Sequence, residues 1–92
     1  MIIQKINESF YMETERLLVN YYYIKGRETP IFEVFNKLDT ERKLLAELKL
    51  NPKKRKYYFY PLPNTAWSSK ALSELHKVIQ KVDKGYKLLG FM

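Results

Sequence analysis

The segment from Asn51 to Pro63 limits the possible folds of this chain more than any other segment. It runs from an Asn-Pro step through four consecutive cations and four consecutive aromatic residues to Pro-Leu-Pro. Because the prolines at both ends prevent a helix from continuing, the aromatic run from Tyr57 to Tyr60 is predicted to be a short β-strand. The sequence therefore predicts a basic loop that leads into one strand, with helical regions before and after it.

Two segments before this strand have apolar patterns that we interpret as helices. In residues 13–25, apolar side chains recur at three- and four-residue steps, although Val and Tyr in the same segment also favour strands. Gly26 follows where a helix would stop. Thr29 and Pro30 are typical of a helix N-terminus, and the apolar residues that follow as far as Leu50 predict either one kinked helix or two.

The most regular pattern predicts a helix after residues 64–69, which offer several N-capping side chains. Its apolar face would be formed by Ala71, Leu72, Leu75, Val78, Ile79 and Val82. A basic stripe on the opposite side would be formed by Lys70, Lys77, Lys81 and Lys84. Gly85 would end this helix, and residues 86–91 would form a strand beside Tyr57–Tyr60. Residues 1–12 are predicted to form an edge strand.

These elements predict one α+β domain spanning residues 1–92, with three or four helices packed on a short two- or three-stranded sheet. Cysteine is absent, so we expect neither disulfides nor a thiolate metal site. No apolar run is long enough to cross a bilayer, and the N-terminus lacks the apolar core of a signal peptide. We therefore expect a soluble, cytoplasmic protein without a membrane partner. Its oligomeric state is left open.

The net charge of +7 is concentrated in the second half of the chain. Residues 1–46 contain seven Lys or Arg and seven Asp or Glu, so their charges cancel. Residues 47–92 contain ten Lys or Arg against three Asp or Glu, and they carry the whole excess. Such a field attracts an acidic partner, for example nucleic acid or an acidic protein face. The alternative interpretation is a basic surface that only keeps the protein soluble.

No residue pattern indicates catalysis, a metal site or a cofactor site. His76 is the only histidine, and no Ser, Cys or Asp motif accompanies it to make it a catalytic base. The three glycines are isolated, so the chain has no phosphate-binding glycine loop. We expect a protein that is not an enzyme and that requires no cofactor.

One hypothesis for the basic half is nucleic-acid binding. Cations would contact phosphates while an exposed aromatic residue of the strand stacks on a base, as in proteins that bind single strands. The candidate residues are Lys53, Lys54, Arg55, Lys56, Tyr58, Lys77 and Lys81. The competing interpretation is structural, because alternate aromatic residues must enter a small core and a basic loop deters pairing at a sheet edge.

The other hypothesis is a protein interface, where tyrosine is a favoured residue. Residues 21–23 are three consecutive tyrosines, and they cannot all face one core. The same region resembles the start of the SirA family, the sporulation inhibitors of replication. The resemblance is formed by Glu15, Val19-Asn20, Tyr21-Tyr22, Gly26-Arg27-Glu28, Phe32-Glu33 and Phe35, and later by the aromatic strand that leads into Pro61-Leu62-Pro63.

This resemblance covers residues 11–35 and, more loosely, residues 58–75. The chain departs from the family at Leu18, where the family has an aromatic residue, and at residues 23–25, which resemble an insertion. It is also shorter than a full-length member. The resemblance implies an inhibitor that docks on the N-terminal domain of the replication initiator DnaA, with Leu18 and Tyr22 one turn apart on a helix and Arg27 nearby.

We therefore expect a non-catalytic, protein-binding regulator or inhibitor, either of DNA replication initiation or, as a module carried by a mobile element such as a phage, of a host protein. The alternative is a small basic nucleic-acid-binding protein.

Overall fold

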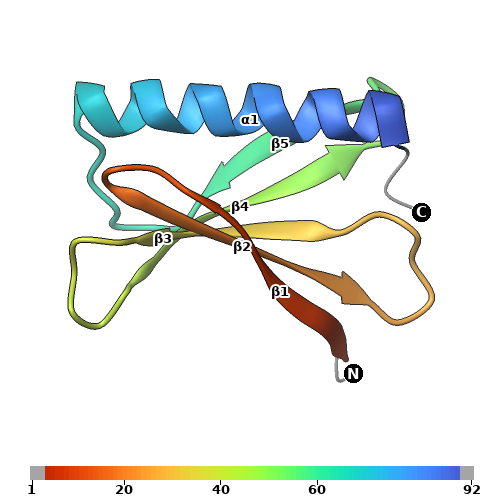
Figure 1. Ribbon diagram of the computed structural model, residues 1–92, viewed down its shortest axis with the longest axis horizontal. Coiled ribbons are helices and arrows are strands. Elements are labelled where there is room, and N and C mark those ends of the chain that lie inside the picture. The colour runs from red at the N-terminus through yellow and green to blue at the C-terminus, as the bar shows by residue number, and fades with distance from the viewer. Residues whose placement is uncertain (1–3, 90–92) are drawn as a thin grey trace.

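The computed structural model describes residues 4–89, which form an antiparallel β-sheet and a long helix (Figure 1). The five strands lie side by side in their chain order, so every connection between neighbouring strands is a hairpin. Helix α1 covers one face of the sheet, and no element within residues 4–89 covers the other face. The elements are β1 (Lys5–Glu13), β2 (Leu17–Ile24), β3 (Ile31–Asn36), β4 (Leu44–Asn51), β5 (Lys56–Pro61) and α1 (Ser69–Leu89).

The predicted fold, with three or four helices on a two- or three-stranded sheet, is wrong. The segment predicted as the first helix contains β2, and the segment from residue 31 to residue 50 contains β3 and most of β4. The reason is clear in β2, where Leu17 and Val19 face the helix while Leu18 is buried on the other face. A strand buried on both faces is a continuous apolar run, and such a run also contains apolar residues at helical spacing.

The structure also corrects the prediction for the C-terminal residues. Helix α1 continues through Gly85 to Leu89, so Tyr86–Leu89 is helical and does not form a strand beside β5. Gly90 and Phe91, the rest of that predicted strand, lie outside the described residues. The predicted N-terminal edge strand is confirmed from residue 5 onwards by β1, whereas residues 1–3 lie outside the described part.

Two elements predicted from the sequence are confirmed. Tyr57–Tyr60 lies within β5, and the last helix begins at Ser69. The N-cap is Ser68, whose hydroxyl oxygen accepts a hydrogen bond from the Ala71 N–H at 3.1 Å. The predicted apolar face packs on the sheet through Leu75, Val78 and Val82, whereas Leu72 is 46% exposed.

The hydrophobic core lies between α1 and the covered face of the sheet. Phe32 on β3 is at its centre, and its ring packs edge-to-face against Tyr11 and Tyr57, with centroids 4.8 Å and 5.4 Å away. The Tyr57 hydroxyl donates a hydrogen bond to the Pro30 carbonyl at 2.9 Å, and burial raises the pKa of Tyr57. The buried core consists of Leu17, Val19, Phe32, Val34, Ala46, Leu48, Tyr57, Leu75, Val78 and Val82.

Strand β5 is an edge strand whose free edge is partly blocked. The Tyr57 N–H donates a hydrogen bond to Asp83 Oδ1 of α1 at 2.7 Å. The backbone nitrogen of Pro61 points to the same free edge, because backbone groups alternate in direction along a strand. Proline has no N–H group, so this position cannot donate a hydrogen bond to a further strand. The Tyr57–Asp83 contact also places the start of β5 beside the C-terminal part of α1 (Figure 1).

The N-terminal part of α1 is attached to the sheet by Glu74, whose side chain is 16% exposed. Its carboxylate accepts hydrogen bonds from the Thr14 hydroxyl, the Arg16 backbone N–H (2.9 Å) and the Arg16 guanidinium (2.7 Å). Burial alone would raise the pKa of Glu74, but these hydrogen bonds and the charge of Arg16 outweigh burial and lower the pKa below its ordinary value of 4.5.

We expect ionised Glu74 to make part of the folding stability dependent on pH. A carboxyl group with a lowered folded-state pKa stabilises the fold above its unfolded pKa, and this contribution is lost as the pH falls through the folded pKa. The wild-type protein should therefore lose stability below pH 4.5, and Glu74→Gln should lose less over the same range. Urea unfolding of both proteins between about pH 7 and about pH 3 measures this difference. Equal losses would contradict the role of Glu74.

Candidate nucleic-acid interface

A basic turn that is held by hydrogen bonds to Asn51 connects β4 to β5. The side-chain oxygen of Asn51 accepts hydrogen bonds from the N–H groups of Lys53 (3.1 Å) and Lys54 (3.2 Å), and the Arg55 N–H donates to the Asn51 backbone carbonyl at 2.8 Å. Arg55 has a φ of 57°, in the left-handed region, where the chain turns back into β5. Lys53, Lys54, Arg55 and Lys56 are all exposed, and none forms an ion pair within residues 4–89.

The strand that follows this turn presents two tyrosines to solvent. Tyr57 and Phe59 face α1, so Tyr58 and Tyr60 lie on the uncovered face, where they are 38% and 45% exposed. Side chains two positions apart on a strand are about 6.8 Å apart. The two rings therefore form a short aromatic row that continues directly from the four cations.

Polar contacts link Tyr60 to the middle of the uncovered face. Glu47 on β4 is the direct cross-strand partner of Tyr60 on one side and of Glu33 on the other. Its carboxylate accepts a hydrogen bond from the Tyr22 hydroxyl at 3.1 Å and lies 3.6 Å from Lys49 Nζ. The same ammonium group lies over the Tyr60 ring, 5.6 Å from its centroid.

Glu33 is a buried carboxylate in the centre of this face, with a relative exposure of 4%. Its Oε2 atom lies 3.2 Å from Lys5 Nζ, which also lies over the Tyr22 ring. Its Oε1 atom is buried and has no hydrogen-bond partner among the residues that the structure describes. Burial, followed by the nearby Glu47 carboxylate, raises the pKa of Tyr22, which therefore stays protonated and donates to Glu47.

The predicted protein-binding residues occupy positions that differ from the expected helix. Leu18 and Tyr22 lie on strand β2, and both project onto the uncovered face. They are only 9% and 5% exposed, because neighbouring side chains surround them. Arg27 is exposed in the turn between β2 and β3. In this arrangement Leu18 and Tyr22 offer little surface to a protein partner.

The structure divides the predicted nucleic-acid-binding residues into two groups. Lys53–Lys56 and Tyr58 are neighbours, as described above. Lys77 and Lys81 are exposed on α1, which covers the face of the sheet opposite to Tyr58, and Lys81 Nζ lies 5.2 Å from the centroid of the Tyr11 ring. Lys77 and Lys81 are therefore not part of the surface that carries Tyr58.

Tyr60, Glu47 and Lys49 also belong to this surface, although they were not among the residues predicted from the sequence. Alternation within β5 places Tyr60 on the same face as Tyr58. In β4 the three polar residues Glu47, Lys49 and Asn51 alternate with apolar ones, which is the pattern of a half-buried strand. This signal was available in the sequence, but the helical interpretation of the preceding leucines obscured it.

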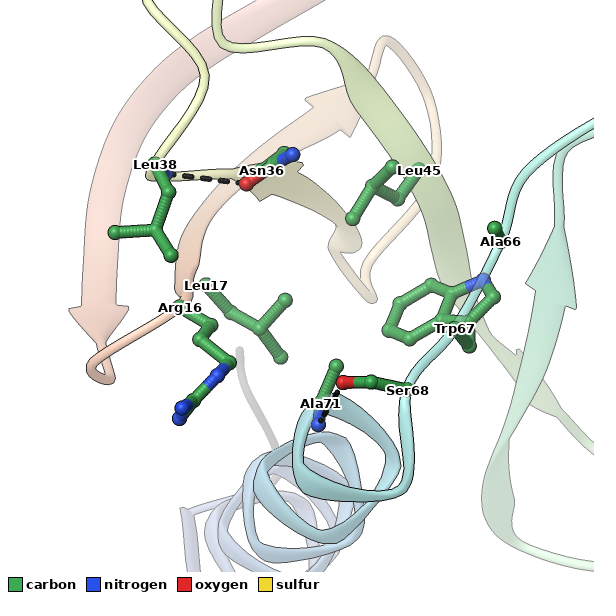
Figure 2. Close-up of a pocket in the computed structure, with 9 residues that line it drawn as sticks. All are labelled: Arg16, Leu17, Asn36, Leu38, Leu45, Ala66, Trp67, Ser68 and Ala71. Carbon is green, nitrogen blue, oxygen red and sulfur yellow. Dashed lines mark hydrogen bonds between the residues drawn. The ribbon is translucent and has the colours of Figure 1, made fainter.

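A separate cleft of about 560 Å³ lies at the opposite end of the sheet, beside the start of α1 (Figure 2). Leu17, Leu45 and Trp67 supply apolar side chains to its walls. Arg16 is the only charged residue of the lining, and it is paired with Glu74 at 2.7 Å. The cleft therefore offers apolar surface without a free charge to orient a ligand, and we assign no function to it.

Comparisons with protein-family models, with curated proteins and with solved structures found no match. Within residues 4–89, no helix is long and apolar enough to span a membrane. Over the same range, His, Cys, Asp and Glu side chains form no group of three that could hold a metal ion.

Proposed function

We propose that this protein binds single-stranded nucleic acid, without catalysing a reaction, through the basic turn and strand β5. The observation that carries the proposal is the position of four exposed cations, Lys53–Lys56, directly before two exposed tyrosines on one face of the strand. The cations supply contacts to phosphate groups, which contribute most of the affinity of non-specific nucleic-acid binding. Tyr58 and Tyr60 supply faces on which bases stack.

The aromatic row favours a single strand over a duplex. Bases in a duplex stack on one another inside the helix, whereas the bases of a single strand can be splayed out onto aromatic side chains. The basic turn is held by hydrogen bonds from Lys53, Lys54 and Arg55 to Asn51, so its backbone needs little ordering on binding.

A protein-binding inhibitor of replication initiation, as the SirA resemblance implies, is supported less well. That function would require a partner to dock on Leu18 and Tyr22, which are almost fully buried by neighbouring side chains. Exposed aromatic anchors usually supply the energy at the centre of such interfaces. The exposed aromatic residues of β5 lie instead beside the positive charge.

Fluorescence anisotropy with labelled single-stranded DNA and RNA of about 12 nucleotides, and with a duplex of equal length, tests this proposal. We expect micromolar or tighter binding to the single strands, weaker binding to the duplex, and an affinity that falls steeply with salt concentration. Failure to bind single strands at low salt, or equal binding of the duplex, would refute the proposal.

Replacing either tyrosine should weaken binding without changing its salt dependence. Tyr58→Ala and Tyr60→Ala each remove a stacking surface worth about 1–3 kcal/mol, while the cations remain. Phe10→Ala is the matched control, because Phe10 is 59% exposed on the uncovered face but lies on β1, at the opposite edge of the sheet. If all three variants bind like the wild type in the anisotropy assay, bases do not stack on β5.

A further inference from the structure

Glu47 adjoins the space above the Tyr60 ring. The two residues are direct cross-strand partners, and the Cβ atoms of such partners are about 4.5–5.5 Å apart. The Lys49 ammonium group shows that one group can reach both side chains, since its Nζ lies 5.6 Å from the Tyr60 centroid and 3.6 Å from Glu47 Oε1. A base stacked on this side of Tyr60 would take the position of the Lys49 ammonium group, and its N–H groups would then lie within reach of the Glu47 carboxylate.

This carboxylate is oriented and still has the capacity to accept hydrogen bonds. Glu47 Oε2 accepts from the Tyr22 hydroxyl, and the 3.6 Å contact of Oε1 with Lys49 is longer than a hydrogen bond. The neighbouring Oε1 atom of Glu33 is buried without a hydrogen-bond partner within residues 4–89. Glu33 Oε1 is too deeply buried to meet a ligand, so the acceptor that a ligand can reach is Glu47 Oε1, which suits a ligand that brings N–H donors.

We infer that Glu47 makes the interface prefer guanine over thymine or uracil at the base that stacks on Tyr60. The inference rests on the proposed function. A carboxylate can only accept hydrogen bonds, and guanine offers two adjacent donors, the N1–H and the 2-amino group. Thymine and uracil present a single N–H between two carbonyl oxygens, which a carboxylate repels. Adenine and cytosine each have one amino group beside an acceptor, so we expect their affinity to lie between that of guanine and that of thymine or uracil.

The test compares labelled thymidine oligonucleotides of about 12 nucleotides that carry guanine, inosine or thymine at one central position. Inosine is the matched ligand control, because it keeps the N1–H of guanine and lacks only the 2-amino group. We expect the wild-type protein to bind the guanine oligonucleotide about tenfold more tightly than the all-thymine one, with inosine between them.

Glu47→Gln is the matched protein variant, because its side-chain oxygen can still accept from the Tyr22 hydroxyl while the negative charge is lost. In this variant the affinities for the guanine-containing and all-thymine oligonucleotides should become nearly equal, and binding of the all-thymine strand should become tighter. Equal binding of the three oligonucleotides by the wild type, or an unchanged preference in the variant, overturns this inference alone. Failure to bind any of them overturns the proposed function instead.

Discussion

Replacing Phe32 with alanine should remove a large fraction of the folding stability of this protein. Phe32 is 1% exposed at the centre of the core, where its ring contacts Tyr11, Tyr21 and Tyr57. Truncating a buried phenylalanine costs about 3–5 kcal/mol through lost burial and the cavity left behind. Small proteins have a total stability of only about 5–15 kcal/mol, so a large fraction of it would be lost.

Urea and thermal unfolding followed by circular dichroism measure this effect, and Phe10→Ala provides the control. The Phe10 side chain is 59% exposed, so its truncation should change the free energy of unfolding by no more than about 0.5 kcal/mol. Similar unfolding midpoints for Phe32→Ala and Phe10→Ala would show that the sheet does not pack around Phe32 as described.

Neutralising the basic turn should nearly abolish nucleic-acid binding. Replacing Lys53, Lys54, Arg55 and Lys56 with glutamine removes the exposed cations that precede the aromatic row. Each lost phosphate contact should reduce the slope of log affinity against log salt concentration by about 0.7, and the affinity at physiological salt should fall on the order of 100-fold. The anisotropy salt series described above measures both quantities.

The matched control neutralises the lysine stripe of α1, namely Lys70, Lys77, Lys81 and Lys84. Both variants lose four positive charges from a net charge of +7, so a general effect of net charge would weaken both equally. We expect the stripe variant to bind much more tightly than the turn variant, because Lys77 and Lys81 belong to α1, which covers the face of the sheet opposite to Tyr58. If the stripe variant bound more weakly than the turn variant, the interface would lie on α1 and not on β5.

The elements that could be predicted from sequence are those whose local pattern agrees with their environment. Helix α1 packs on the sheet along one face only, so its apolar residues follow the helical period and Leu75, Val78 and Val82 are buried as predicted. Strand β5 is bounded by proline-containing turns that exclude a helix, so its position follows from the covalent structure of proline.

Strands β2, β3 and β4 were predicted as helices because local preference and tertiary environment disagree there. β4 consists mainly of Leu, Ala, Glu and Lys, which are good helix formers. Its backbone nevertheless pairs with β3 on one side and β5 on the other, and that pairing outweighs the preference of single residues. In β2, burial on both faces removes the alternation that would have identified a strand.

The same division applies to the candidate interface. The sequence alone determined that four cations precede an aromatic strand, because those residues are neighbours in the chain. Only the tertiary structure decided which tyrosines remain exposed, that Glu47 lies beside Tyr60, and that Lys77 and Lys81 belong to another surface. The physical reason is that the face of a side chain depends on sheet register and on where the helix packs. Both are set by contacts between residues that are far apart in the chain.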